Sequence, residues 1–100
     1  MGLERHDFIE KRAHKRVPVF HHARAVGSEG QPLSLVIVDL SAGGLMARCD
    51  HPLTTGDRLQ VHVPGIGLRS AHVCWALGGR IGCEFDTPIS LEAYLAVTAK

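Results

Sequence analysis

The chain is 100 residues long, which leaves room for one hydrophobic core and no second domain. Its net charge of +1 argues against the broad basic face that binds DNA or RNA, and its aromatic content of 5% is too low for a base-stacking platform. The 45% hydrophobic content instead favours a small packed domain.

The first sixteen residues carry few apolar side chains, so we expect a mobile basic arm or a weak helix over residues 1–16. Four cations cluster in this segment: Lys11, Arg12, Lys15 and Arg16. Such a local group would attract an anion to this part of the chain. The alternative is a solvated basic tail.

Neither a transmembrane helix nor a secretory signal is indicated, because the longest apolar run is short and the opening residues are polar. We therefore expect a cytoplasmic protein that does not insert into a membrane. Its three cysteines would stay reduced there.

Short strands punctuated by glycine-, proline- and threonine-containing turns follow the arm. We expect strands over residues 17–26, 33–40, 45–49, 58–63, 68–77 and 81–85. Residues 58–63 show the clearest alternation of apolar and polar side chains, which is typical of a strand with one buried face. The spacing predicts a small, mainly β barrel.

The last two strands are expected to form a hairpin with every bulky apolar side chain on one face. The predicted pairs are Val73 with Phe85, Trp75 with Cys83, and Leu77 with Ile81. This register requires a three-residue loop over residues 78–80. It buries both Trp75 and Phe85 and places Cys74 and Cys83 on opposite faces, which argues against a disulfide between them.

A short helix is expected over about residues 90–99. Ser90 is suited to cap its first turn, Glu92 lies in that turn, and apolar residues follow at helical spacing. We expect this helix to pack against the barrel or to cover one end, and the alternatives are a frayed tail or an interface helix.

A polar motif of the form Asp-x-Ser-x-x-Gly closes the second strand at residues 39–44. Asp39 and Ser41 alternate with apolar neighbours, so both side chains are expected on one face, with Val38 and Leu40 on the other. We expect the glycines to allow a sharp turn. The alternative is that Asp39 and Ser41 cap the turn through bonds to the backbone.

Two motifs in this order, Arg12-x-x-x-Arg16 before the first strand and Asp39-x-Ser41-x-x-Gly44 after the second, resemble the PilZ domain family of cyclic di-GMP receptors. The resemblance spans roughly residues 11–98, because Trp75 and residues 81–85 also look like the late strands of that fold. It implies a stand-alone domain with a six-stranded antiparallel β-barrel over residues 17–100, a flexible arm and a short C-terminal helix.

The resemblance also implies a role for each motif residue. Arg12 and Arg16 would hold phosphate and the O6/N7 edge of guanine, or stack on the base. Asp39 would accept hydrogen bonds from guanine N1 and N2, and Ser41 would contribute its hydroxyl. Gly44 would keep a backbone geometry that a Cβ would obstruct.

Lys11, Lys15 and Gly43 are accessory candidates. Many PilZ-like sequences carry an arginine at the position of Lys11, and lysine can neither stack nor form a forked contact as arginine does. This departure leaves open whether one ligand molecule or an intercalated pair is held.

The implied function is that of a bacterial second-messenger receptor. Cyclic di-GMP would order the arm against the barrel, and a downstream protein partner would read the new surface. We expect a monomer or weak dimer that binds no nucleic acid. The alternative from another class is a PilZ-like adaptor that binds protein but no nucleotide.

Catalysis and metal binding are not expected. No nucleophile elbow or oxyanion loop accompanies Ser41 and Asp39, so we expect no enzyme. The Cys-x-His pair at residues 49–51 and the His-x-Cys pair at residues 72–74 lack the spacing of zinc sites, so we expect no metal and no other cofactor.

Overall fold

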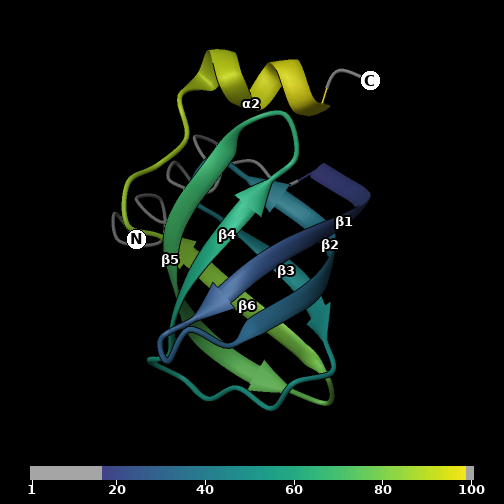
Figure 1. Cartoon of the computed structure of the whole chain (residues 1–100). Coiled ribbons are helices and arrows are strands. Elements are labelled where there is room, and N and C mark those ends of the chain that lie inside the picture. The colour runs from purple at the N-terminus through teal and green to yellow at the C-terminus, as the bar shows by residue number, and fades with distance from the viewer. Residues whose placement is uncertain (1–16, 99–100) are drawn as a thin grey trace, which may run out of the picture.

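The computed structural model of the chain describes residues 17–98 (Figure 1). The predictions for residues 1–16, including the arm and its four cations, lie outside these residues. The described elements are β1 (Val17–Gly27), β2 (Pro32–Ser41), β3 (Gly44–Cys49), β4 (Arg58–Val63), β5 (Gly67–Leu77), β6 (Arg80–Phe85) and α2 (Leu91–Thr98). Each predicted strand and the helix are confirmed to within one residue at either end.

The strands form a closed antiparallel barrel in the order β1-β2-β3-β6-β5-β4. Closure depends on β1, which pairs with β2 along most of its length and with β4 through its last four residues, Arg24 to Gly27. A strand that pairs on both sides leaves no open sheet edge at this seam. The predicted six-stranded barrel is therefore confirmed.

The core fills the inside of the barrel with alternate residues of each strand. In β4 the pattern is regular, since Leu59, Val61 and Val63 are buried and the intervening residues are exposed. The largest side chains that are almost completely buried are Leu35, Ile37, Leu40, Leu59, Val61, Val63 and Val73. These branched side chains pack together and fill the interior of the barrel.

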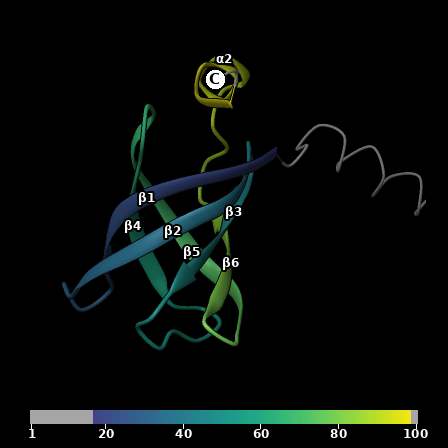
Figure 2. The same cartoon turned by 90° about the vertical axis from the view of Figure 1, so that its right-hand side faces the viewer.

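The helix α2 lies over one end of the barrel, as two perpendicular views show (Figures 1 and 2). The Ala93 N–H donates to Ser90 Oγ at 3.1 Å, which confirms Ser90 as the N-cap. Tyr94 is buried, and the predicted position of the helix against the barrel is thus confirmed. Among the described residues, no helix is long and apolar enough to span a membrane.

The predicted register of the β5–β6 hairpin is wrong. Trp75 pairs with Gly82 rather than Cys83, and Leu77 pairs with Arg80, so the loop is the two-residue Gly78-Gly79 turn. Both glycines have positive φ, of 60° and 82°, as the tight hairpin turn that matches strand twist requires.

A bulge on β5 explains why this register is compatible with a packed core. The register shifts between Val73 and Trp75, so Cys74 is the extra residue. After the bulge, the residues of β5 that were expected to face the core face outward. Trp75 is therefore 38% exposed, contrary to prediction, while Phe85 is buried as predicted. Trp75 packs over Gly82, and among the described aromatic side chains Phe20 is exposed as well.

All three cysteines lie in the described residues and are free, with Cys74 exposed and Cys83 buried. The predicted separation of these two thiols is confirmed. Burial, and then the neighbouring Cys74 and Cys49 thiols, raise the pKa of Cys83 from its ordinary value of 9.0 to about 12. The folded protein therefore holds this proton more tightly than the unfolded chain does.

This pKa predicts a loss of stability at alkaline pH. The contribution of Cys83 is complete below about pH 9 and is lost as the pH rises toward 12, because only the unfolded chain then releases the proton. Urea unfolding across this range should show the parent losing about 1 kcal/mol per pH unit more than Cys83→Ala. Parallel declines of the two proteins would contradict the assignment.

Candidate functional site

The residues of the Asp-x-Ser-x-x-Gly motif lie at the end of β2 and in the turn to β3. Ser41 pairs with Gly44 across a two-residue turn. The Gly44 N–H donates to Ser41 Oγ at 3.0 Å, and the Ser41 hydroxyl donates to Gly44 O at 3.3 Å. The Ser41 hydroxyl therefore closes the turn, as one of the two sequence-based interpretations anticipated for this residue.

The predicted alternation of faces at this strand end does not hold. Leu40 and Ser41 are both buried, whereas Asp39 and Val38 are half-buried. A register shift between Ile37 and Asp39 interrupts the regular pleat just before the motif. Ser41 thus serves the turn from a buried position, and its contact with a ligand stays a prediction.

Gly44 lies where the backbone of β6 comes close. A Cβ at this position would lie 2.1 Å from the carbonyl oxygen of Cys83. The prediction that a Cβ would be obstructed is confirmed, although the obstacle is the neighbouring strand. Neither Gly43 nor Gly44 has a positive φ. The turn between β2 and β3 therefore does not need the left-handed backbone conformation that favours glycine.

Asp39 is half-buried beside the C-terminal helix, and its Oδ1 atom is buried. The Tyr94 hydroxyl donates to Leu40 O at 3.4 Å. Burial, and then the charge of Asp39, raise the pKa of Tyr94. The carboxylate and the phenol are therefore electrostatic neighbours, and Tyr94 stays a neutral donor at physiological pH.

The C-terminal segment also holds the turn through its backbone. The Ile89 N–H donates to Ala42 O at 2.7 Å, and the Phe85 N–H donates to Gly43 O at 2.8 Å. Together with the bond from Tyr94 to Leu40, three residues between positions 85 and 94 donate hydrogen bonds to carbonyl oxygens of the motif. This role was not predicted from the sequence. The one available signal was a tyrosine on a short apolar helix, since a buried phenol needs a partner.

The start of β1 lies beside the same motif. Val17 pairs with Leu40, and Pro18 pairs with Asp39. Asp39, Ser41, Gly43 and Gly44 are thus brought together at one end of the barrel. Lys11, Arg12, Lys15 and Arg16 lie outside the described residues, although the chain that carries them joins the barrel at Val17.

A groove elsewhere on the described residues contains no motif residue. It is an open hollow of about 760 Å³ against the outer side chains of β1 and its neighbours. The residues that line it include His22, Arg24, Val26, Ser34, His62 and Leu68. The described part of the candidate site, a strand end and a turn, therefore lies outside this groove.

Comparison with known proteins indicates the same family as the two motifs. The model of the PilZ domain family matches residues 10–98. Among solved structures, the chain is similar to the crystal structure of the PilZ domain of CeSA from a cellulose-synthesizing bacterium, with 18% identity and a TM-score of 0.63 over 84% of this chain and 94% of that chain. At this identity the likeness shows the fold alone. No curated protein matches the chain.

Proposed function

Because the chain belongs to the PilZ domain family, whose members are generally receptor domains for cyclic di-GMP, we propose that it binds this nucleotide. The ligand would lie between the Arg-x-x-x-Arg segment and the end of β2. PilZ domains are binding domains rather than catalytic ones, which agrees with a receptor.

The pairing of β1 with β2 is the observation that carries this proposal. Val17 lies opposite Leu40, and Arg16 immediately precedes Val17 in the chain. Consecutive Cα atoms lie about 3.8 Å apart, so the second arginine is tethered next to the strand end that bears Asp39. The Arg-x-x-x-Arg motif would then lie near the Asp-x-Ser-x-x-Gly motif, although 22 residues of sequence separate Arg16 from Asp39.

The chemistry of these residues suits a cyclic dinucleotide that carries two phosphates and two guanines. Arg12 and Arg16 would neutralise phosphate and contact the guanine O6/N7 edge. Asp39 would accept from the guanine N1 and N2 donors. Ser41 and Gly44 would act mainly by fixing the turn, given the two hydrogen bonds between them.

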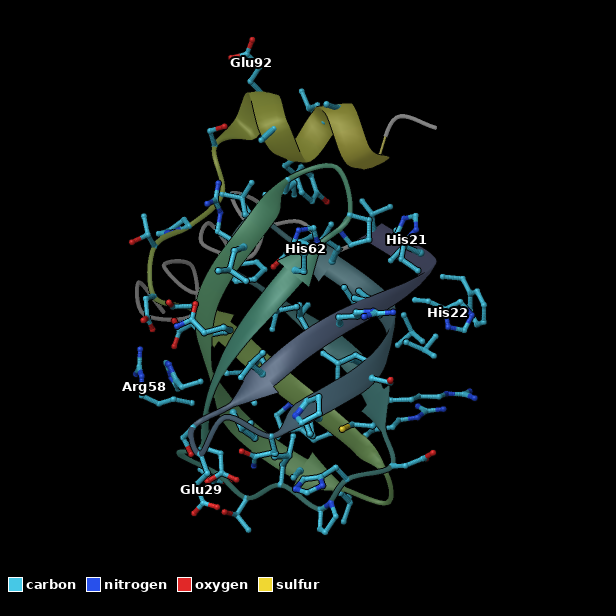
Figure 3. All side chains as sticks on the ribbon, viewed as in Figure 1. His21, His22, Glu29, Arg58, His62 and Glu92 are labelled. Atoms are coloured by element: carbon cyan, nitrogen blue, oxygen red, sulfur yellow. The ribbon has the colours of Figure 1, made fainter. Side chains whose placement is uncertain are left out.

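Ligand binding would order residues 1–16 over this end of the barrel. The motif that the ligand would contact also accepts hydrogen bonds from Phe85, Ile89 and Tyr94. Because Tyr94 belongs to α2, the ligand and α2 would both contact this motif. Glu92 on α2 points away from the barrel (Figure 3), and Leu95 is exposed. A downstream protein would read the surface formed by the ordered segment together with this helix.

Calorimetric titration of cyclic di-GMP into the full chain tests the proposal, with GTP as the competitor control. Arg12→Ala and Asp39→Ala should each weaken binding by about 1–3 kcal/mol, or roughly fivefold to 150-fold. Arg24→Ala and Asp50→Ala remove the same side chains from exposed positions outside the motif and should bind as the parent does.

The binding ratio would also decide whether one nucleotide or an intercalated pair is held, which the lysine at position 11 leaves open. Absence of heat and of competition at high nucleotide concentration would overturn the receptor proposal. That outcome would favour the adaptor alternative, in which the same surface binds protein alone.

A further inference from the structure

Three side chains that commonly bind metal ions gather on the outer face of the barrel, away from the core. His72 and Cys74 belong to β5, and Glu84 belongs to the neighbouring strand β6. One ligand atom from each residue lies within 4.8 Å of the other two. The His-x-Cys spacing of residues 72–74 does not by itself indicate a metal site, because the third residue of the group, Glu84, comes from another strand.

The register and the bulge of β5 bring these residues together. His72 is the direct cross-strand partner of Glu84. Val73 between His72 and Cys74 is completely buried, so its two neighbours point outward. Cys74 is also the extra residue of the bulge, and bulges commonly redirect a side chain at such a position.

The separation of the first two ligand atoms matches a tetrahedral metal centre. His72 Nε2 lies 3.4 Å from Glu84 Oε1. Nitrogen and oxygen ligands each about 2.0–2.2 Å from a zinc ion, at a tetrahedral angle, are themselves about 3.4 Å apart. An ion between these two atoms would thus need little movement of either side chain, and the Cys74 sulfur would supply a third ligand.

A second carboxylate lies near the other ring nitrogen of the histidine. His72 Nδ1 lies 3.9 Å from Asp86 Oδ1, while Asp86 Oδ2 is bound by Arg58, which Figure 3 shows on the outside of the barrel. Histidine ligands of zinc usually donate their second ring N–H to a carboxylate, which fixes the ring and strengthens the ligand. At 3.9 Å the two atoms are not hydrogen-bonded, and the His72 and Asp86 side chains would have to approach each other for Asp86 to accept that bond.

We propose that His72, Cys74 and Glu84 bind a thiophilic divalent cation of the zinc type, with a fourth position open to water. A thiolate and a carboxylate would balance the two charges of the ion. The three proposed ligands are not residues of the motif at the end of β2, although Glu84 pairs with Gly44 of that motif. The inference does not rest on the proposed nucleotide binding.

Metal binding at this site must displace a proton. A cysteine thiol must lose its proton before its sulfur can bind a metal ion. The ion forms a bond to sulfur, and the thiol proton passes to the solvent. No oxidant or other reactant takes part in this exchange.

Cobalt and zinc titrations of the full chain test the proposal. With Co²⁺, the parent should develop a thiolate-to-cobalt charge-transfer band, which Cys74→Ser should lose. With Zn²⁺ in competition with a chromogenic chelator, one ion per chain should bind, and His72→Gln and Glu84→Gln should each weaken binding at least about tenfold. His51→Gln is the matched control, since it removes an exposed histidine outside the cluster.

Circular dichroism of each variant would establish that the barrel is retained. A charge-transfer band that persists in folded Cys74→Ser would overturn the proposal. So would zinc binding that is equally strong in the parent, His72→Gln and Glu84→Gln, because the ion would then be held elsewhere.

Discussion

Gly44→Ala should lower the free energy of unfolding by about 3 kcal/mol or more, at the upper end of the range for overpacking in a closely packed protein. The new Cβ would lie 2.1 Å from the carbonyl oxygen of Cys83, far inside a normal contact distance. This obstacle is backbone, and it belongs to the strand that pairs with Gly44. Relief therefore requires β3 and β6 to move apart.

Gly82→Ala provides a matched control for this prediction. Its Cβ would also lie 2.1 Å from a neighbouring atom, but that atom is Nε1 of the Trp75 side chain, which is partly exposed and can turn away. We expect a cost of about 1 kcal/mol. Trp75 is the single tryptophan, so its fluorescence would report the displacement directly.

Urea unfolding of the parent and both glycine variants measures the difference. The Gly44 variant should also melt about 12–24 °C below the parent, given the usual relation between free energy and melting temperature for a domain of this size. Equal losses in Gly44→Ala and Gly82→Ala would show that the close approach of β6 does not constrain Gly44.

Leu40→Ala should destabilise the protein by about 2–5 kcal/mol, because it opens a cavity in a closely packed interior. Leu40 is 1% exposed and lies between Asp39 and Ser41 in the motif. Its carbonyl also accepts the Tyr94 hydroxyl. The cavity would therefore open beneath the strand end that we propose contacts the ligand.

Two variants separate the cavity from other effects of the substitution. Leu40→Met conserves most of the volume and should cost less than about 1.5 kcal/mol. Leu77→Ala makes the same change as Leu40→Ala at a side chain that is 79% exposed, and it should alter stability by less than about 0.5 kcal/mol. Chemical denaturation measures all three, and a loss in Leu40→Ala no larger than in Leu77→Ala would contradict the packing role.

Both predictions concern residues that serve the fold and the proposed site together. Gly44 fixes the distance between β3 and β6, and Leu40 supports the strand end from inside. Neither change removes a group that would contact the nucleotide. A variant that folds but binds weakly would thus report the importance of the turn's geometry, whereas Arg12→Ala and Asp39→Ala report direct contacts.

Local sequence patterns were sufficient to predict the strands and the capped helix and to identify the two motifs. Alternation in β4 has period two because adjacent side chains of a strand point to opposite faces, and this signal is local. Ser90 is recognisable for the same reason, since a cap bonds to a backbone N–H three residues away. The order and spacing of the motifs were sufficient to indicate the family.

Tertiary packing set the register of the last hairpin, the contacts of the motif and the grouping of the three proposed metal ligands. The bulge at Cys74 adds one residue to β5, and this extra residue makes the two-residue turn compatible with a packed core. Alternation of apolar and polar residues alone cannot reveal such an extra residue. Tyr94 meets Leu40 across 54 residues of sequence, and Glu84 meets His72 across a strand pair. Such contacts depend on how the barrel closes, because closure determines which distant residues become neighbours.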